Sequence, residues 1–536
     1  MFTLPDVMRS CHFLACGACA VALVGASACS DARVPVWTDG DFGDWAGIAP
    51  VVVDPMGDAG PGSPVDLRTV AAQDDPRFLH VLIDLGATVT AQGMLGSVEV
   101  VLDADGDRAT GGAYGGVEGA DLAIVLSREV AADSDVHGAG VGIRRVGSDG
   151  PGQVEGSASA GLLVAPTHSS DRFELRVERG AVGAMGRVVV GRVRYLSGGD
   201  IVDETPIFTH VLVTEPGGDP PLLGADELAR APGTHRVVVW NVSSRSFRAN
   251  RRAFQRVLAG LAPDVVLLDE VYADVTMEEL AGFGEGVPVG EAAPDAWSWW
   301  LASGGGRQRT VVGARGLEVR GARGLSRIDH APGALEGWLG EVGDDPESPG
   351  MAPPAELAMA EEEGGLSATG AWVSLDGRDV LFVPVDLQSA GYDGSPRDRL
   401  RELQARTLNR AVAAALAERP GAGLVIGGDL NVVGSARPLD ELRRGLGIDG
   451  GDLVVARLER RRDRSLSTWR GTWGDDPFSP GRLDFVLYRG AVLRAQRAFV
   501  FDAADLTADA LRDLGLRDSD TEHSDHLPLV VDFRVR

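Results

Sequence analysis

The chain has 536 residues, too many for one ordinary domain, and two or three domains are expected. It carries 78 acidic against 51 basic residues, a net charge of −27, so avid nonspecific binding to nucleic acid is disfavoured by long-range repulsion. Hydrophobic residues make up 44% of the chain, which is typical of a globular protein with buried cores and excludes a wholly disordered one.

The first 28 residues are predicted to be an export signal. An apolar run from about Phe13 ends in Ala26-Ser27-Ala28, a small-x-small cleavage pattern. The run is shorter than the roughly 20 apolar residues that a membrane-spanning helix needs, and no transmembrane helix is expected elsewhere. Cys29 follows directly and resembles a bacterial lipoprotein acceptor cysteine. Plain cleavage after Ala28 and a lipid anchor at Cys29 both predict an exported bacterial protein, either periplasmic, an outer-membrane lipoprotein or secreted.

Residues 34–213 are predicted to form an all-β sandwich. Short hydrophobic runs such as Phe78–Ile83, Val98–Leu102 and Phe173–Val177 are separated by Gly, Asp and Pro, and helical periodicity is absent. Residues 214–234 then contain a double glycine and a double proline, which break both helix and strand, so we interpret them as a linker.

Two acidic motifs in the predicted sandwich carry a resemblance. One is Asp39–Trp45, with the pattern D-G-x-x-x-D-W, and the other is Leu102–Asp107, which is followed by Thr110-Gly111 and Gly119-Ala120-Asp121. These signatures resemble the family nine carbohydrate-binding modules and related DOMON-like sandwiches. The resemblance implies a surface polysaccharide as partner, whereas the small number of aromatic residues in this region favours a structural or surface-docking sandwich.

Three alternating acids of the second motif are candidate calcium ligands. Asp103, Asp105 and Asp107 could supply carboxylate oxygens to Ca²⁺. The loop is not an EF-hand, because its sixth position is Arg108 instead of glycine and its twelfth is Tyr114 instead of glutamate. An acidic hairpin turn without a metal is the alternative.

The pattern changes after the linker, and residues 235–536 are predicted to be an α/β domain. Strand-like runs alternate there with segments of helical spacing. Residues 341–365, rich in Glu, Asp, Pro, Gly and Ala, are predicted to be a surface loop or a disordered insertion. The strand-like runs are Arg236–Trp240, Asp264–Leu268, Val380–Val385 and Gly423–Ile426, and the helical segments are Arg251–Leu261 and Pro396–Ala417.

Five segments of this region place an acid, an amide or an imidazole where a hydrophobic strand ends, which is how an α/β scaffold presents chemistry at its rim. Each segment alone is as well explained by a turn, a helix cap or a structural histidine. Their order and their position after strands indicate a site. The segments are Trp240-Asn241-Val242, Leu268-Asp269-Glu270-Val271, Gly428-Asp429-Leu430-Asn431, Arg482-Leu483-Asp484-Phe485-Val486 and Ser524-Asp525-His526.

Together these segments resemble the endonuclease/exonuclease/phosphatase superfamily over about residues 235–536. The family's G-D-x-N motif falls on Asp429 and Asn431, and its S-D-H-x-P motif falls on Ser524–Pro528. The resemblance implies a four-layer α/β sandwich, in which two β-sheets are flanked by helices and the site lies between the loop ends of the sheets. It also implies a hydrolase of phosphoester bonds that depends on Mg²⁺ or Mn²⁺.

The resemblance assigns metal-binding residues. The family's amide in the first strand falls on Asn241 and its metal-binding glutamate on Glu270, and both offer the hard oxygens that suit Mg²⁺ or Mn²⁺. Asp525 would carry a second metal or assist the first.

The resemblance also assigns catalytic residues. Asp429 would orient or deprotonate the attacking water, and Asn431 would contact the phosphate. Asp484 would hold the imidazole of His526 in position, and His526 would hydrogen-bond the phosphate oxygens more strongly as charge develops on them.

Asp386 departs from the family pattern. Many members carry a histidine at the end of the strand Val380–Val385, where this chain continues with Asp386. Asp386 is a candidate catalytic or metal-binding residue, and the missing donor could come from Arg397, Arg399 or Tyr392. Two further candidate phosphate clamps follow Gly304-Gly305-Gly306, with a solvated turn as the alternative. These clamps are Arg307 and Arg309.

The sequence therefore predicts an exported metal-dependent phosphoesterase, a phosphodiesterase, nuclease or phosphatase that attacks its ester with metal-assisted water. The substrate classes are nucleic acid, a phospholipid headgroup or a small phosphate ester. The rival hypothesis, motivated by Asp386, is a cell-surface binding protein whose sandwich binds glycan and whose second domain is a degenerate, inactive enzyme. The enzyme hypothesis requires one cleft to bring together Asn241, Glu270, Asp429, Asn431, Asp484 and His526.

Overall fold

The computed structural model describes residues 35–536, except for 92–93, 95, 128–139, 182, 184, 216, 288–295, 307, 348–350 and 472–478. The predicted export signal at residues 1–28, the predicted anchor Cys29 and the candidate clamp Arg307 lie outside the described residues. Within the described part of the chain, no helix is both long and apolar enough to cross a membrane.

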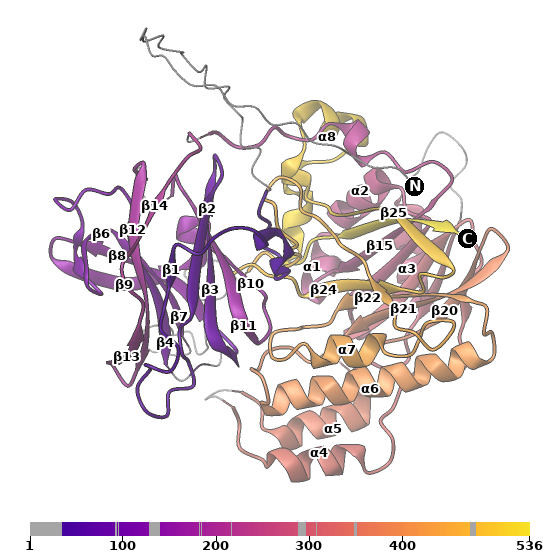
Figure 1. Cartoon of the computed structure of the whole chain (residues 1–536). Helices are drawn as coiled ribbons and strands as arrows, with labels where there is room; N and C mark the ends of the chain where they lie inside the picture. The colour runs from indigo at the N-terminus through magenta and orange to yellow at the C-terminus, as the bar shows by residue number, and fades with distance from the viewer. Residues whose placement is uncertain are drawn as a thin grey trace, which may run out of the picture. The chain divides into compact units, whose positions relative to one another are not determined.

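Two antiparallel sheets and a short hairpin contain the described strands of the first region (Figure 1). The five-stranded sheet has the order β1-β2-β3-β11-β10, and the seven-stranded sheet has the path β13-β12-β4-β7-β8-β9, with β14 paired to β12. The strands are β1 (Val52–Val53), β2 (Thr69–Asp74), β3 (Phe78–Val89), β4 (Ser97–Asp103), β5 (Gly112–Tyr114), β6 (Val117–Ala120), β7 (Leu122–Ser127), β8 (Gly140–Gly147), β9 (Gly150–Gly156), β10 (Leu163–Ala165), β11 (Ser170–Glu178), β12 (Val188–Ser197), β13 (Asp200–Glu204) and β14 (Phe208–Val211).

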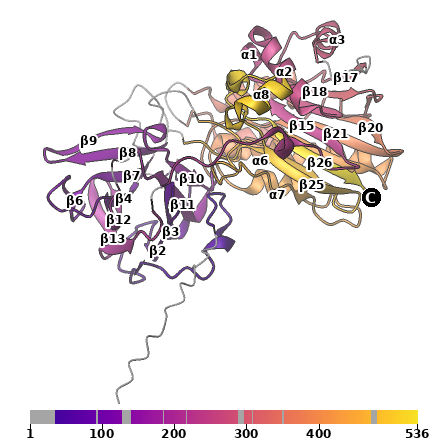
Figure 2. The same cartoon turned by 90° about the horizontal axis from the view of Figure 1, so that it is seen from above.

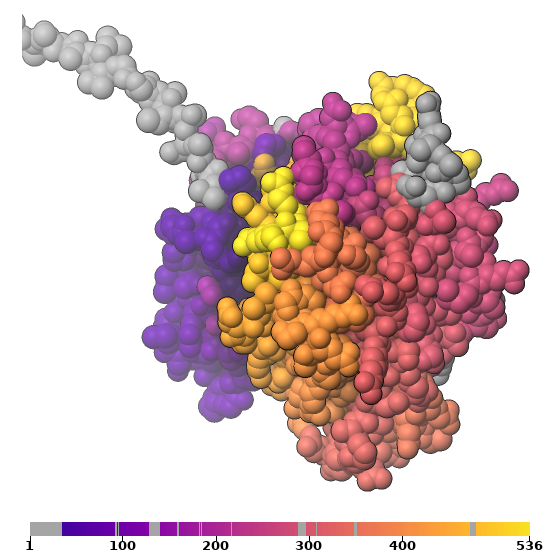
Figure 3. All heavy atoms as spheres, turned by 90° about the vertical axis from the view of Figure 1, so that its right-hand side faces the viewer, coloured from indigo at the N-terminus to yellow at the C-terminus, as the bar shows by residue number. Residues whose placement is uncertain are grey.

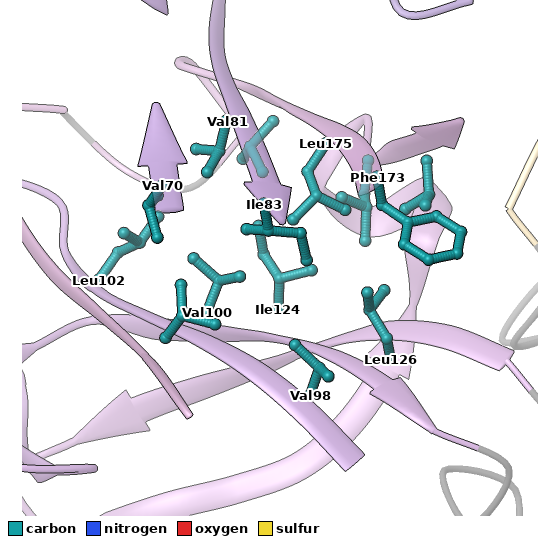
Figure 4. Packing of buried hydrophobic residues seen from close by; sticks show 14 of the residues in the cluster. Val70, Val81, Ile83, Val98, Val100, Leu102, Ile124, Leu126, Phe173 and Leu175 are labelled. Carbon is teal, nitrogen blue, oxygen red and sulfur yellow. The ribbon is translucent and has the colours of Figure 1, made fainter. Parts of the chain in front are cut away.

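The inner faces of these two sheets share one hydrophobic core. Figure 4 shows Ile83 of β3 pointing toward Val100 of β4 and Ile124 of β7, and all three are buried. Successive side chains of a strand point to opposite faces, so each sheet contributes every second residue to this core. The arrangement agrees with the predicted sandwich. The helical turns described in this region are of the 3₁₀ type, η1 (Phe42–Trp45) and η3 (Ser157–Ala160).

Two six-stranded mixed sheets follow. The first has the order β17-β18-β16-β15-β26-β25, of which Figure 2 shows β15, β26 and β25 side by side. The second has the order β19-β20-β21-β22-β24-β23. The pairs β15 with β16 and β21 with β22 are parallel. The strands are β15 (His235–Asn241), β16 (Val265–Tyr272), β17 (Trp297–Leu301), β18 (Gln308–Arg315), β19 (Arg320–Gly321), β20 (Ala371–Leu375), β21 (Arg378–Asp386), β22 (Gly423–Asp429), β23 (Val454–Val455), β24 (Asp484–Tyr488), β25 (Leu493–Val500) and β26 (Leu529–Val535).

These two sheets pack face to face, and helices cover their outer faces. Val239 of β15 and Val425 of β22 belong to one buried cluster between the sheets. Phe254 of α2 packs into a cluster with the first sheet, and Leu408 of α6 packs into a cluster with the second. The order helix, sheet, sheet, helix agrees with the predicted four-layer sandwich. The helices are α1 (Ser244–Ala249), α2 (Arg251–Leu261), α3 (Met277–Glu285), α4 (Ala334–Val342), α5 (Pro354–Gly364), α6 (Pro396–Ala417), α7 (Arg437–Arg443) and α8 (Ala508–Leu514), with 3₁₀ turns η4 (Ala225–Leu228), η5 (Ala503–Asp505) and η6 (Asp518–His523).

The prediction of a loop or disordered insertion at residues 341–365 is wrong for its second half, which α5 occupies. Pro354 fits the first helical position, where its missing N–H costs nothing, and Ala, Leu, Met and Glu follow as strong helix formers. Ala358 is buried against Trp338 of α4 and Leu400 of α6. In Figure 3 the segment that carries α4, α5 and α6, coloured salmon to orange, forms the lower part of the visible surface.

The long helix α6 begins at a strong N-cap, which gives a stability prediction. Ser395 is 2% exposed, and its Oγ accepts hydrogen bonds from the backbone N of Asp398 at 3.3 Å and of Tyr392 at 3.1 Å. Ser395→Ala removes the acceptor of both buried N–H groups and is expected to lower the free energy of unfolding by about 1–2 kcal/mol. Urea unfolding of the variant checks this, and an unchanged midpoint would contradict it.

Candidate active site

Polar residues lie at the carboxyl ends of both parallel strand pairs. Asn241 ends β15 and is in register with Asp269 of β16. Asp386 ends β21 and is in register with Asp429 at the end of β22. The antiparallel strand β24 begins at Asp484, directly opposite Asp429. Three neighbouring strands of the second sheet therefore bring three carboxyl groups side by side at one edge, where α/β sheets bind ligands.

Glu270 is positioned by irregular backbone. The register between β16 and β18 shifts between Leu268 and Val271, and Glu270 has a φ of 51°, in the left-handed region. A bulge of this kind re-aims a side chain next to an active site. Here the Glu270 carboxylate accepts a hydrogen bond from Nδ2 of Asn241 at 3.2 Å. The hydroxyl of Ser244 donates to the backbone oxygen of Glu270 at 2.8 Å and holds the bulge in place.

His526 and Asp484 form a buried hydrogen-bonded pair. Nδ1 of His526 lies 2.8 Å from Oδ2 of Asp484, and the same oxygen accepts a hydrogen bond from the Thr468 hydroxyl at 2.7 Å. Nε1 of Trp240 donates to the backbone oxygen of His526 at 2.9 Å. These contacts fix the imidazole with its Nε2 facing Oδ2 of Asp429 at 3.7 Å.

The charges of this cluster act on both His526 and Asp429. Burial favours the neutral imidazole, but the carboxylates of Asp484 and Asp429 outweigh burial and hold the pKa of His526 well above its usual value. Burial raises the pKa of Asp429 to about 7, opposed by the charge of His526 and reinforced by that of Asp484. Near neutral pH the site therefore combines an imidazolium donor with a carboxyl group poised to accept a proton.

Asn431 and Asp525 are oriented by their neighbours. Asn431 adopts a φ of 47°, its backbone N donates to Oδ1 of Asp429 at 2.8 Å, and its Nδ2 donates to the backbone oxygen of Leu387 at 2.8 Å. Oδ2 of Asp525 accepts a hydrogen bond from Nε1 of Trp469 at 3.2 Å. The charge of Asp525 adds to burial in raising the pKa of Glu270.

Two further acids, Asp269 and Asp386, lie at the site. Asp269 is fully buried, and neither of its carboxyl oxygens has a hydrogen-bond partner among the described residues. Burial, with the charges of Asp484 and Asp386, raises the pKa of Asp269 well above its usual value. Burial and the charges of Glu270 and Asp429 do the same to the pKa of Asp386. A divalent cation would favour the ionised form of these acids, and carboxyl oxygens are its preferred ligands, so the residues present fit Mg²⁺ or Mn²⁺.

The predicted arginine donors that the structure describes do not contact these acids. Arg309 lies on β18, and within the described ranges its side chain makes no hydrogen bond or ion pair with a site residue. Arg397 is buried and lies 3.7 Å from Glu347, and the exposed Arg399 lies 3.7 Å from Glu341. A phosphate clamp from these three side chains would require them to leave these positions.

Four residues that sequence reasoning left without a role belong to the surroundings of the site. Asp269 had a detectable signal, since it adjoins the metal-binding glutamate at a strand end. Arg401 of α6 is fully buried, donates to the backbone oxygens of residues 388 and 390, and interacts electrostatically with Asp429. Thr468 and Trp469 orient two site acids from an irregular segment that no sequence pattern marks.

The predicted calcium ligands of the first region are only partly grouped. Asp103 and Asp105 lie with Asp121 in a group whose ligand oxygens are within 4.8 Å of one another, and Asp107 is not part of it. Backbone N–H groups donate to Asp103 and Asp121 at 2.7 and 2.8 Å, and the Thr110 hydroxyl donates to Asp105. These contacts fit an acidic hairpin turn, and calcium binding by Asp103 and Asp105 stays a prediction.

Comparisons with known proteins address the region after the linker. A family model described as "Endonuclease/Exonuclease/phosphatase family" matches residues 238–526, more than half of the chain. Among solved structures, truncated TDP2 from Caenorhabditis elegans is 16% identical, with 56% of this chain and 97% of that chain covered and a TM-score of 0.35. The human Nocturnin catalytic domain with bound sulfate is 15% identical, with 57% and 97% covered and a TM-score of 0.35. None of the curated proteins matches this chain.

Proposed function

The chain belongs to the endonuclease/exonuclease/phosphatase family, and from this premise we propose that it is an exported, divalent-metal-dependent phosphoesterase. The observation that carries the proposal is the meeting of two hydrogen-bonded pairs in one acidic cluster. Glu270 is bonded to Asn241, His526 is bonded to Asp484, and the charge of His526 acts on Glu270. A domain kept only for packing gains nothing from burying such a costly set of charges.

The metal side of the site would be built around Glu270. Its carboxylate is held by Asn241, and Asp525, whose charge acts on Glu270, would be the second acid on this side. When bound, Mg²⁺ or Mn²⁺ supplies positive charge that polarises a phosphoryl oxygen and offsets the charge of the leaving group. Asp269 and Asp386 would then ionise more readily, because the cation compensates for their mutual repulsion.

The other side of the site would handle the water and the phosphoryl group. Asp429 orients the attacking water and takes its proton, since burial places its pKa near neutrality. The Nε2–H of His526 donates to a phosphoryl oxygen, and this hydrogen bond strengthens as negative charge develops there. Asp484 keeps the ring charged and in one orientation by accepting from Nδ1 at 2.8 Å.

The substrate class is a phosphate ester with an accessible phosphoryl group, from nucleic acid, a phospholipid headgroup or a small molecule. The net charge of −27 favours a small or single-stranded substrate over a long duplex. The export signal at 1–28, the anchor at Cys29, the boundaries 34–213, 214–234 and 235–536, and a polysaccharide partner of the sandwich remain predictions from the sequence.

Metal dependence is tested by Glu270→Gln, which keeps the shape of the side chain and removes its charge. We expect the Mg²⁺ concentration for half-maximal hydrolysis to rise about 10–100-fold. The measurement is a Mg²⁺ titration of hydrolysis over a panel of phosphodiesters and phosphomonoesters, after treatment with EDTA. The matched control is Glu278→Gln, an exposed glutamate of α3 that should change nothing. Full activity of the wild type in EDTA, or an unchanged Mg²⁺ requirement in Glu270→Gln, would contradict the proposal.

A further inference from the structure

Three aspartates gather at the end of β1, and none of them is among the residues predicted to bind metal. Asp54 directly follows β1, Asp203 lies on β13, and Asp58 lies in the segment that joins β1 to β2. One carboxyl oxygen of each lies within 4.8 Å of one oxygen of the other two. The end of β1, the strand β13 and the segment that joins β1 to β2 therefore meet at this group of acids.

Asp54 is the unusual member of this group. The residue is 3% exposed, and neither of its carboxyl oxygens has a hydrogen-bond partner in the described part of the chain. A buried carboxylate is ordinarily hydrogen-bonded, paired with a cation or bound to a metal, because leaving water without a partner is costly. Asp54 has none of these, so a partner of positive charge is the simplest completion of the site.

The protein groups around Asp54 do not supply that charge. Burial, together with the charges of Asp203, Asp58, Asp66 and Glu204, raises the pKa of Asp54 to about 6. Oδ2 of Asp203 accepts a hydrogen bond from the backbone N of Leu67 at 2.7 Å, and Oδ1 of Asp66 accepts one from that of Gly57 at 2.8 Å. Glu204 is paired with Arg192 at 2.9 Å.

The Asp103, Asp105 and Asp121 group is an internal comparison. Each of those carboxylates receives a hydrogen bond from a backbone N–H or a hydroxyl, and none of their oxygens is buried without a partner. Each acid of that group therefore has a hydrogen-bond donor. The Asp54 group has the same composition but leaves its most buried member unsatisfied, which is the difference that points to a ligand.

We propose that Asp54, Asp58 and Asp203 bind one calcium ion, which fastens the segment between β1 and β2 to β13. Ca²⁺ accepts carboxylate and backbone carbonyl oxygens in a flexible geometry, whereas Mg²⁺ demands a near-ideal octahedron and keeps its water. The segment already lies on β13, since the backbone N of Gly60 donates to the oxygen of Val202 at 2.9 Å. The ion adds a link between the segment and both strands.

Calcium binding is measured by titration calorimetry on the full chain after treatment with EGTA. We expect one equivalent of Ca²⁺ to bind with a Kd of about 10⁻⁶–10⁻³ M, and this binding to be lost in Asp58→Asn and Asp54→Asn. Asp58 is exposed, so its substitution leaves the fold intact. Binding should persist in Asp107→Asn, in the hairpin, and in Glu270→Gln, at the proposed catalytic metal site. Undiminished binding in Asp54→Asn and Asp58→Asn overturns the proposal, whatever happens to hydrolysis.

Thermal unfolding distinguishes two roles for Asp54, a metal ligand or an acid that only stabilises the fold. In EGTA, Asp54→Asn should raise the Tm, because it removes one negative charge from a buried like-charge cluster. Calcium should raise the Tm of the wild type by mass action and leave that of Asp54→Asn unchanged. A variant that is destabilised in EGTA and still gains stability from calcium would show that Asp54 is a structural acid and would refute the site.

Discussion

Replacing His526 with alanine is expected to lower kcat/KM for phosphoester hydrolysis about 10²–10³-fold, the range seen when a preorganised donor to a developing oxyanion is removed. The reason is electrostatic. The carboxylates of Asp484 and Asp429 hold the pKa of His526 well above its usual value despite burial, so the ring stays charged where the phosphoryl oxygen gains charge. The loss should fall mainly on kcat, because the interaction strengthens in the transition state.

His523→Ala is the matched control. His523 ends η6 three residues earlier and makes no hydrogen bond to a site residue within the part of the chain that the structure describes, so its removal should leave hydrolysis unchanged. Thermal unfolding of both variants shows whether the fold survives. A folded His526→Ala protein that keeps at least a tenth of wild-type activity would contradict the proposed role of His526 as donor to the phosphoryl oxygen.

Asp484→Asn separates orientation from charge in the same arm. The asparagine can still accept the Nδ1–H of His526 but no longer offers a negative charge, so the pKa of His526 should fall. The alkaline limb of the pH–rate profile should therefore move to lower pH. A purely structural role of Asp484 would lower stability without moving that limb.

The layers of the fold and the ends of its central strands could be predicted because the signals are local. One buried strand ends at Asp429 and another begins at Asp484. Each appears in the sequence as a hydrophobic run with an acid at one end. The parallel pairing of β21 with β22 then places Asp386 beside Asp429 without further information. Helix α5 was missed because its Glu and Pro were counted as loop composition, whereas Ala358 packs against two other helices.

The remaining features of the site depend on contacts between distant segments. Thr468 touches Asp484 across 16 positions of sequence, from a segment with no periodicity. The bulge that turns Glu270 toward Asn241 is a register shift against β18, and a register shift is invisible before the strands are paired. The burial of Asp269 likewise follows only from the packing of the two sheets, so its adjacency to Glu270 did not reveal its environment.

The same limit explains the two acidic groups of the first region. Asp103, Asp105 and Asp107 are candidate ligands from the sequence because they alternate, yet the structure groups the first two with Asp121 and supplies each of them with a hydrogen-bond donor. Asp54 and Asp203 are about 150 positions apart and share no motif, yet they meet at the edge of two strands. The spacing of acids in the sequence identifies candidate metal ligands. Only the structure shows which of their buried oxygens lack a hydrogen-bond partner, and this difference favours the Asp54 group.

Asp429→Asn is expected to lower kcat about 10²–10⁴-fold, the contribution of a positioned general base. In the wild type the backbone N of Asn431 donates to Oδ1 of Asp429 at 2.8 Å. Asparagine keeps an oxygen that can accept this hydrogen bond, so the turn should survive. It cannot take a proton from water. Loss of the general base should also change the pH dependence of kcat, whereas loss of a structural contact should not.

The sign of that pH effect follows from the charge states of the site. Burial raises the pKa of Asp429 to about 7, and a bound divalent cation lowers it, so the acid limb of the wild-type profile should lie at or below about pH 7. Activity rises as Asp429 loses its proton, and the limb should be absent from the residual activity of Asp429→Asn. Asp440→Asn, an exposed-face substitution in α7, is the control and should retain both rate and limb. An acid limb that persists in Asp429→Asn would assign the base to another carboxyl group of the cluster, and Asp386 and Asp269 are two acids there whose pKa is raised.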